Sequence, residues 1–202
     1  KNVDDQWIVL SVCQKTENPL TAKYFIRILS FSKKLIFDEP VDRKYTCVTS
    51  YDRLVYLSGG ATLVRYMIWG NDKLLCTTRL DNAGTNIVSL KFSIIPLLNE
   101  CVIVGDENYG LMIYRFTNEK KLECVWKEKI HRMITSLNIF SITANRIQAA
   151  SFNIITGDRS GNVTLQRTKV SEKFSLEILF NINVGAPVTG VSFFENPGQP
   201  VI

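Results

Sequence analysis

Two stretches of the sequence repeat one pattern. Residues 102–116 read VIVGDENYGLMIYRF and residues 154–168 read IITGDRSGNVTLQRT. Each is an apolar run that ends in Gly-Asp, followed by a short polar turn and then by a run in which apolar and polar residues alternate. Alternation with a period of two is typical of β-strands, so each stretch predicts a hairpin. Asp106 and Asp158 lie 52 positions apart, which indicates a unit of about fifty residues that recurs along the chain.

Short apolar or alternating runs fill most of the remaining sequence. They are joined mainly by links of fewer than eight residues, a spacing typical of a hairpin-rich, all-β domain. No stretch keeps a helical apolar period with caps, and 139–150 is the only segment that we expect to form a weak helix or a loop. The sixteen predicted strands are 7–12, 24–31, 34–41, 45–52, 54–60, 62–69, 73–80, 87–93, 101–106, 111–117, 121–129, 134–140, 152–158, 162–170, 175–184 and 187–194.

These runs fall into groups of four. Units at 45–80, 87–129 and 134–184 each hold four predicted strands, 7–41 holds most of another unit, and 187–202 opens a further one. Four strands in about fifty residues is the signature of a β-propeller blade. We therefore expect residues 1–202 to form a single propeller segment, a partial ring of about four to five blades. We expect the apolar second strand of each unit to lie near the central channel. Because open ends would expose unpaired strand edges, we expect the remaining blades elsewhere in a longer chain.

The Gly-Asp motifs predict structural turns. Glycine adopts positive φ without a steric penalty, which suits it to the turn between the second and third strands. The carboxylates of Asp106 and Asp158 are expected to accept hydrogen bonds from the backbone amides of their own turns. A phosphate-binding loop would lead into a helix, and a calcium loop would need more oxygen ligands, so both alternatives are disfavoured. The flanking glycines are Gly105 with Gly110 and Gly157 with Gly161.

Charge and cysteine content exclude several classes of protein. A net charge of +5 is mild for 202 residues, and the lysine clusters fit solvated hairpin edges. This charge permits weak contact with nucleic-acid phosphates but falls short of a basic footprint. The five cysteines form no CxxC motif and there is one histidine, so we expect neither a zinc site nor another metal site. An odd number of cysteines indicates a reducing compartment, and no apolar run is long enough to span a membrane.

The order of motifs along the chain resembles a known family. The resemblance runs from WIVLSVCQKTENPLTAKYFIRILSF through DRLVYLSGGATLVRYMIWGNDKLL, CVIVGDENYGLMIYRF, MITSLNIF and NIITGDRSGNVTLQRT to NINVGAPVTGVSFF. These segments are similar to the C-terminal region of the triple-propeller proteins. That family includes the large DNA-damage-binding protein that adapts cullin ubiquitin ligases. It also includes the largest subunit of the cleavage and polyadenylation specificity factor and a large subunit of the branch-site splicing particle.

The resemblance implies a propeller that packs beside another one and docks partner helices in the cleft between them. It implies a protein of the nucleus, with the cytoplasm as a second location, that belongs to a hetero-oligomeric complex. We expect an adaptor for a cullin-type ubiquitin ligase in DNA repair, with a scaffold for splicing or for mRNA 3′-end cleavage and polyadenylation as the alternative. In the ligase branch a tryptophan opens the blade after the first Gly-Asp turn, and this sequence departs from that pattern with Met133.

A binding scaffold fits these residues better than an enzyme does. The single histidine, His131, lies among basic residues, and no nucleophile elbow, HExxH motif or phosphate loop is present. We therefore expect no catalytic residue and no cofactor. Instead we expect loops 105–110, 130–134 and 157–162 to line one face that grips a helix or peptide of another protein, with Tyr109 and Met133 as apolar anchors. The expected partner-binding residues are Asp106, Glu107, Asn108, Tyr109, Arg132, Met133, Asp158 and Arg159.

Overall fold

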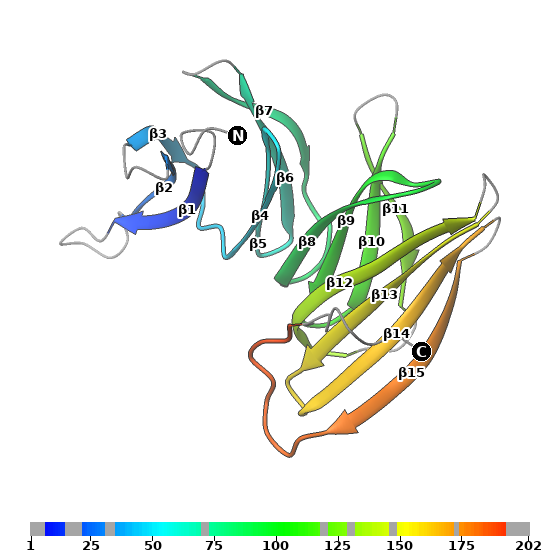
Figure 1. The fold of residues 1–202 in the computed structure, drawn as a ribbon. Helices are drawn as coiled ribbons and strands as arrows, with labels where there is room; N and C mark the ends of the chain where they lie inside the picture. Colours follow the sequence, from blue (N-terminus) through cyan, green and yellow to red (C-terminus); the bar gives the residue numbers. More distant parts are fainter. Residues whose placement is uncertain are drawn as a thin grey trace.

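Antiparallel strands make up all the regular structure in the computed structural model, which describes residues 7–14, 22–30, 35–69, 73–117, 121–128, 132–145, 149–171 and 174–192. The strands form one three-stranded sheet and three four-stranded sheets that follow one another along the chain (Figure 1). The first sheet holds β1 (Trp7–Gln14), β2 (Lys23–Ser30) and β3 (Leu35–Val41). The second holds β4 (Cys47–Tyr51), β5 (Leu54–Gly59), β6 (Thr62–Trp69) and β7 (Lys73–Leu80).

The other two sheets have the same order. The third holds β8 (Ile87–Ile95), β9 (Asn99–Asp106), β10 (Gly110–Phe116) and β11 (Leu122–Lys127). The fourth holds β12 (Ile134–Asn145), β13 (Ala149–Asp158), β14 (Asn162–Val170) and β15 (Ser175–Asn183). In each sheet consecutive strands are neighbours. The predicted all-β class is therefore confirmed, and the four sheets coincide with the four predicted units.

A bulge recurs at one position of the repeat. The register between the third and fourth strands shifts at Arg65/Tyr66 in the second sheet, at Ile113/Tyr114 in the third and at Leu165/Gln166 in the fourth. These bulges occupy equivalent places in the three sheets. Each begins two residues after a third-strand residue that pairs with the end of the second strand, and these pairs are Leu63 with Ser58, Leu111 with Gly105 and Val163 with Gly157. A bulge increases the local right-handed twist of a sheet, so all three four-stranded sheets are twisted at the same point.

The first strand of each sheet lies at the hub of the arc. β8 contacts β4 on one side and β12 on the other, and β1 contacts β4, whereas the fourth strands β7 and β11 only touch each other marginally. The second strands, predicted to lie near a central channel, come next to the hub: β5 contacts β8, and β9 contacts β12. β5 and β9 are strongly apolar because both of their faces are covered by neighbouring sheets.

A separate apolar cluster fills each gap between consecutive sheets. Ile26 and Ile28 of β2 pack against the second sheet through Val55, Leu57 and Val64. The next gap is filled by Tyr56 and Leu63 against Val102, Val104 and Met112. The last gap joins Ile103, Leu111 and Ile113 to Ile134, Phe152 and Ile154. The facing sides of consecutive sheets are thus buried against each other, as in a fan, whereas β15 at the edge of the fourth sheet is largely exposed.

Two sequence predictions need correction here. The segment 139–150 is no helix, because β12 extends to Asn145 and β13 begins at Ala149, with Thr143 paired to Ser151 across a bulge. That bulge interrupts the alternation and hides the strand from a pattern search. The predicted strand 187–194 is also absent from its described part, since residues 187–192 are irregular. They form no ladder with a described strand.

Residues 188–191 nevertheless occupy the place where a further first strand would begin. The Val191 backbone amide donates to Ser136 Oγ at 2.9 Å, just as the Leu137 amide donates to Ser89 Oγ at 3.1 Å one sheet earlier. The partner serines are equivalent, because Ser136 pairs with Gly157 and Ser89 pairs with Gly105. One joint therefore connects the third sheet to the fourth and the fourth to the segment that follows it.

Candidate functional site

The turn after β9 is organised by a buried carboxylate. Asp106 is fully buried, and its Oδ1 accepts hydrogen bonds from the backbone amides of Asn108 and Tyr109, both at 2.9 Å. Its Oδ2 accepts from the amides of Thr85 at 2.8 Å and Asn86 at 3.0 Å, which belong to the loop between the second and third sheets. Asp106 therefore holds its own turn and also ties that turn to the loop beside it.

The ionised form of Asp106 is the stable one in this setting. Burial by itself would raise the pKa of the carboxyl group, but the hydrogen bonds from Tyr109, Asn108 and Thr85 outweigh burial and lower the pKa below its ordinary value. A carboxylate that accepts several backbone amides is a fixed structural charge.

The turn after β13 repeats the arrangement in a simpler form. Asp158 is buried, and its Oδ1 accepts hydrogen bonds from the backbone amides of Ser160 and Asn162, both at 2.9 Å. Its Oδ2 accepts from Asn162 Nδ2 at 3.0 Å. All these donors belong to the same turn. The predicted side-chain-to-backbone bonds are thus present in both turns.

The four motif glycines have two different roles. Gly110 and Gly161 have φ of 77° and 89°, as predicted for the turns. Gly105 and Gly157 do not have positive φ and are needed for close packing. A Cβ at Gly105 would lie 2.7 Å from Ile134 Cγ2, and one at Gly157 would collide with Val188. The positive-φ explanation is therefore wrong for the first glycine of each pair.

An ion pair joins the two turns across the boundary between the third and fourth sheets. Arg159 Nη1 lies 2.9 Å from Glu107 Oε1, and the Arg159 backbone amide donates to the Met133 carbonyl at 3.0 Å. Glu107 is fixed from its other side, because Asn86 Nδ2 donates to its Oε2 at 2.6 Å. Residues from four separate loops are thereby held as one surface, although Glu107 and Arg159 lie 52 positions apart in the chain.

The eight expected partner-binding residues differ in accessibility. Asn108 is exposed, Met133 is 38% exposed, and the side chains of Glu107 and Arg159 are 30% and 61% exposed. We call these four residues the GD face. The carboxylates of Asp106 and Asp158 are engaged inside the fold and are not part of this surface.

Tyr109 and Arg132 are less available than the sequence suggests. Tyr109 is half-buried against the apolar cluster between the second and third sheets, and the Lys127 ammonium lies 3.1 Å from the centre of its ring. Arg132 is paired with Glu128, with Nη2 at 2.9 Å from Oε1, and both side chains are largely buried. Both residues therefore lie beneath the exposed residues of the GD face and pack against neighbouring side chains. His131 and the rest of the segment 129–131 lie outside the described residues.

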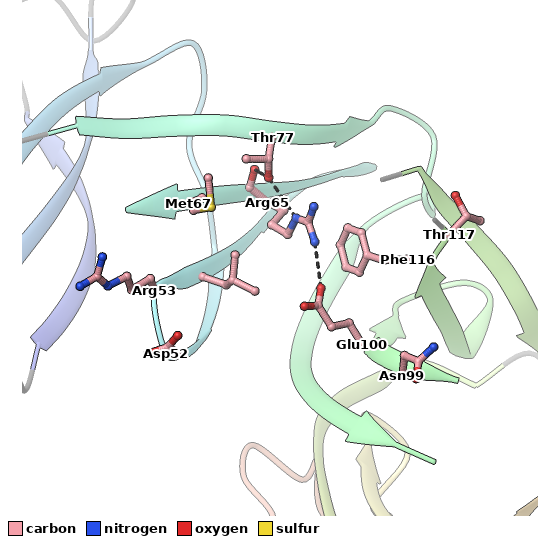
Figure 2. Close-up of a pocket in the computed structure, with 10 residues that line it drawn as sticks. Asp52, Arg53, Arg65, Met67, Thr77, Asn99, Glu100, Phe116 and Thr117 are labelled. Atoms are coloured by element: carbon pink, nitrogen blue, oxygen red, sulfur yellow. Dashed lines mark hydrogen bonds and ion pairs between the residues drawn. The ribbon is translucent and has the colours of Figure 1, made fainter. Parts of the chain in front are cut away.

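A groove at the opposite ends of the strands was missed by the sequence analysis. It has a volume of about 560 Å³ and lies between the second and third sheets. Figure 2 shows Arg65 at its centre, with Nε donating to Thr77 Oγ1 and Nη1 to Glu100 Oε2, both at 2.9 Å. The guanidinium carbon lies 4.0 Å from the centre of the Phe116 ring. The lining residues are Asp52, Arg53, Leu54, Arg65, Met67, Thr77, Asn99, Glu100, Phe116 and Thr117.

The groove combines paired charges with apolar and aromatic groups. Its lining holds the carboxylates of Asp52 and Glu100 together with Arg65 and Phe116. Two of its turn residues, Asp52 and Asn99, have positive φ of 51° and 59°, a conformation that these residue types tolerate better than most. The signal available in the sequence was Arg65 itself, a lone charge in the apolar run TLVRYMIW at the place where the third sheet has Ile113.

The described part of the chain contains no group of three or more His, Cys, Asp or Glu side chains that could hold a metal ion, and no helix that could cross a membrane. Cys47, Cys76, Cys101 and Cys124 are free thiols. Burial raises the pKa of Cys101 to about 12, so this thiol is unreactive at neutral pH.

The fold and the site define a class of protein: an arc of blade-like antiparallel sheets that carries a composite loop surface. No family model matches the sequence, and no curated protein matches it significantly.

Proposed function

We propose that this chain is a segment of a β-propeller that acts as a non-enzymatic scaffold for protein interactions. The partner docks as a helix or peptide on the GD face, formed by Glu107, Asn108, Met133 and Arg159. The observation that carries the proposal is the Glu107–Arg159 ion pair at 2.9 Å, which fastens turns of two different sheets into one surface. Surfaces that are already ordered lose little conformational entropy on binding, and rigid scaffolds commonly present binding loops in this way.

The composition of the GD face matches a small interface centre. Met133 supplies an exposed thioether side chain, which is flexible and adapts to irregular apolar partners. Asn108, Glu107 and Arg159 surround it with both signs of charge and with hydrogen-bonding groups. An apolar centre with a polar rim is the usual arrangement of residues in a protein–protein interface.

The resemblance to the triple-propeller family supports a more specific proposal. On that basis the protein serves as an adaptor in a nuclear complex, namely a cullin-type ubiquitin ligase of DNA repair. The alternative is a scaffold subunit of the splicing machinery or of the mRNA 3′-end cleavage and polyadenylation machinery. The arc of four-stranded sheets and the repeated Gly-Asp turns support membership, and the departure at Met133 weighs against carrying over the partner set of the ligase branch residue by residue.

Affinity purification of the full-length protein with mass spectrometry tests this proposal. The variant Met133→Asp places a charge at the centre of the GD face and is expected to lose the docked partner. Leu75→Asp is the matched control, because Leu75 is 42% exposed on β7 and lies outside the GD face. Recovery of every partner with Met133→Asp at the level of Leu75→Asp would refute the proposed face. A cullin, a splicing particle or a cleavage factor among the specific partners decides the branch.

A further inference from the structure

The gap between the second and third sheets is built differently from the gap after it. In the third sheet Ile103 and Ile113 pair across β9 and β10, and both are fully buried in the cluster against the fourth sheet. The equivalent pair in the second sheet is Tyr56 with Arg65. A guanidinium withdrawn from water is costly even when it is paired, so Arg65 breaks the repeat at a place where isoleucine would pack better.

The groove around Arg65 is the open end of this gap. At the same end of the next gap, Ile95 of β8 and Ala150 of β13 are buried in one cluster. In the gap between the second and third sheets the residues at that end include Leu54, Met67 and Phe116, which line the groove and are only partly buried. The groove therefore has apolar walls around a charged pair.

Glu100 presents an accessible acceptor inside the groove. Its Oε2 accepts from Arg65 Nη1 at 2.9 Å, whereas its Oε1 has no partner among the described residues and is open to solvent. The Glu100 side chain is 40% exposed and that of Arg65 is 9% exposed. Figure 2 shows the Glu100 carboxylate amid the lining residues, beside the Arg65 guanidinium. The charged atom that a ligand can reach is therefore a carboxylate oxygen.

The other charges of the lining favour a cation as well. Asp52 is exposed and has no partner among the described residues, and the guanidinium of its neighbour Arg53 points away from Arg65 and Glu100 in Figure 2. Arg65 is already paired and lies 4.0 Å from the centre of the Phe116 ring. An anionic group would approach the carboxylates of Asp52 and Glu100 before it reached Arg65, and like charges at short range repel.

A second hollow continues the groove along the turn between β8 and β9. It has a volume of about 220 Å³ and shares Asn99, Phe116 and Thr117 with the groove, so the two form one path. Leu97 lines this extension, is 43% exposed and has φ of 72°. A leucine in the left-handed region is strained, and strain of this kind concentrates at functional sites. A path of this shape suits an extended chain better than one small molecule.

We propose that the groove and its extension, together called the Arg65 groove, bind an extended segment of a partner protein that carries an arginine or lysine beside apolar residues. The basic group binds Glu100 Oε1, and its aliphatic stem lies along Leu54 and Met67, as long basic side chains commonly do on apolar surfaces. A neighbouring apolar side chain contacts Leu97. The Arg65 groove lies at the opposite ends of the strands from the GD face and does not depend on it, so one chain can hold two partners at once.

A short peptide, Ac-Ala-Leu-Arg-Leu-Ala-NH₂, is the probe for this site, with glutamine or glutamate in place of arginine as controls. In ¹H–¹⁵N spectra of the full chain, the arginine peptide is expected to shift the Leu97 and Glu100 amides saturably, with a dissociation constant of about 0.1–1 mM. The glutamine peptide should bind about tenfold more weakly, because it lacks the charge, and the glutamate peptide should cause no saturable shift. Equal affinity for the three peptides, or no saturation with arginine, would overturn the proposal.

The charge of Glu100 is tested by a matched pair of variants. Glu100→Gln is expected to weaken the arginine peptide about tenfold, while glutamine still accepts from Arg65 Nη1 and keeps the chain folded. Glu177→Gln is the control, because Glu177 is an exposed carboxylate paired with Lys169 on the fourth sheet, outside the groove. It should leave the affinity unchanged. Equal affinities of the two variants for the arginine peptide would refute the role of Glu100.

Leu97→Gly separates binding from folding. Glycine adopts positive φ without a steric penalty, so the melting temperature is expected to stay the same or rise. The peptide affinity should nevertheless fall at least about threefold, because an apolar contact is lost. A variant that is as stable as the parent and binds the peptide equally well would refute the proposed path along Leu97.

The two docking surfaces fail separately. Met133→Asp alters only the GD face and should leave the peptide affinity of the Arg65 groove unchanged. If the arginine peptide binds while Met133→Asp retains every partner, the groove stands and the GD face is refuted. If the peptide does not bind while Met133→Asp loses the partner, the GD face stands and the groove proposal is refuted.

Discussion

The third and fourth sheets have the same topology, the same Gly-Asp turn and the same bulge, yet they differ in two respects. The third sheet turns an apolar and aromatic stripe toward its neighbour, whereas the fourth turns a polar stripe with a cavity beside it. The carboxylate of Asp106 holds the loop of Thr85 and Asn86, while that of Asp158 holds only its own turn. The repeated backbone therefore fixes the conformation of the Gly-Asp turns more tightly than it fixes the side chains that fill the gaps between sheets.

The largest effect is expected from exchanging the stripes. Met112→Thr gives the third sheet the residue found in the fourth, and it should lower the free energy of unfolding by about 2–4 kcal/mol because a buried side chain is truncated in a packed cluster. The reciprocal Thr164→Met should lower it by about 1–2 kcal/mol, since the added atoms enter an existing cavity but the hydroxyl that accepts from Arg132 Nη1 is lost. Denaturant unfolding measures both. Equal losses would show that the two interiors are packed alike.

The losses in the free energy of unfolding for the two aspartate variants should follow the number of loops that each carboxylate holds. Asp106→Ala is expected to cost about 3 kcal/mol, because it leaves amides of two loops without acceptors, and Asp158→Ala about half of that. Thermal or chemical unfolding of both variants makes the comparison. A larger loss for Asp158→Ala would contradict the bridging role of Asp106.

Acid titration gives a second readout of that bridge. Because the pKa of Asp106 is lowered in the folded state, its contribution to stability is fully present above the unfolded aspartate pKa of about 3.9. It is lost as the pH falls through the lower, folded-state value. Asp106→Asn should remove this part of the pH dependence of unfolding, and an unchanged acid transition would argue against the assignment.

The packing glycines are expected to have intermediate effects. Gly105→Ala places a methyl group 2.7 Å from Ile134 Cγ2 in the closed gap between sheets, and overpacking of this kind costs about 1–3 kcal/mol. Gly157→Ala should cost a similar amount, because its methyl group would collide with Val188, whose backbone amide is held by the Asp158 carbonyl at 3.0 Å. Gly190→Ala is the control, with nothing within 4 Å of the added carbon. The order of the three unfolding midpoints tests the prediction.

The smallest effect belongs to the ion pair that joins the two sheets. Its partners are 30% and 61% exposed, so Glu107→Gln should lower stability by about 0.5 kcal/mol or less and should do so mainly at low salt. A double-mutant cycle with Arg159→Gln measures the coupling. A coupling of several kcal/mol would mean that the pair supports the fold as well as the surface.

Features set by neighbouring residues could be predicted from the sequence. Alternation and turn chemistry depend on residues close together in the chain, so fifteen predicted strands have counterparts in the structure. The hydrogen bonds from backbone amides to the carboxylates of Asp106 and Asp158 were predicted for the same reason. The bulge between Phe140 and Thr143 broke the alternation and concealed the ends of β12 and β13. The sequence placed the second strands near the centre but could not rank them against the first strands, because a strand covered on both faces and a strand at the hub have the same composition.

The features that were missed depend on residues from different sheets. The groove at Arg65 needs Glu100 and Phe116 from the third sheet, and the cavity beside Gln166 needs Glu128 and Arg132 from the segment between the third and fourth sheets. No pattern within one strand indicates which side chains of other sheets will lie beside it. The partial burial of Tyr109 and Arg132 was missed for the same reason, since Lys127 and Glu128 cover them from β11 and the residue after it.

The serine joint sets how each following segment is aligned with the sheet before it. Ser89 and Ser136 each receive a backbone amide from the segment after their sheet. The register of the incoming segment is therefore fixed through its main chain, whereas the apolar cluster in the gap and the close approach of Gly105 to Ile134 select its side chains.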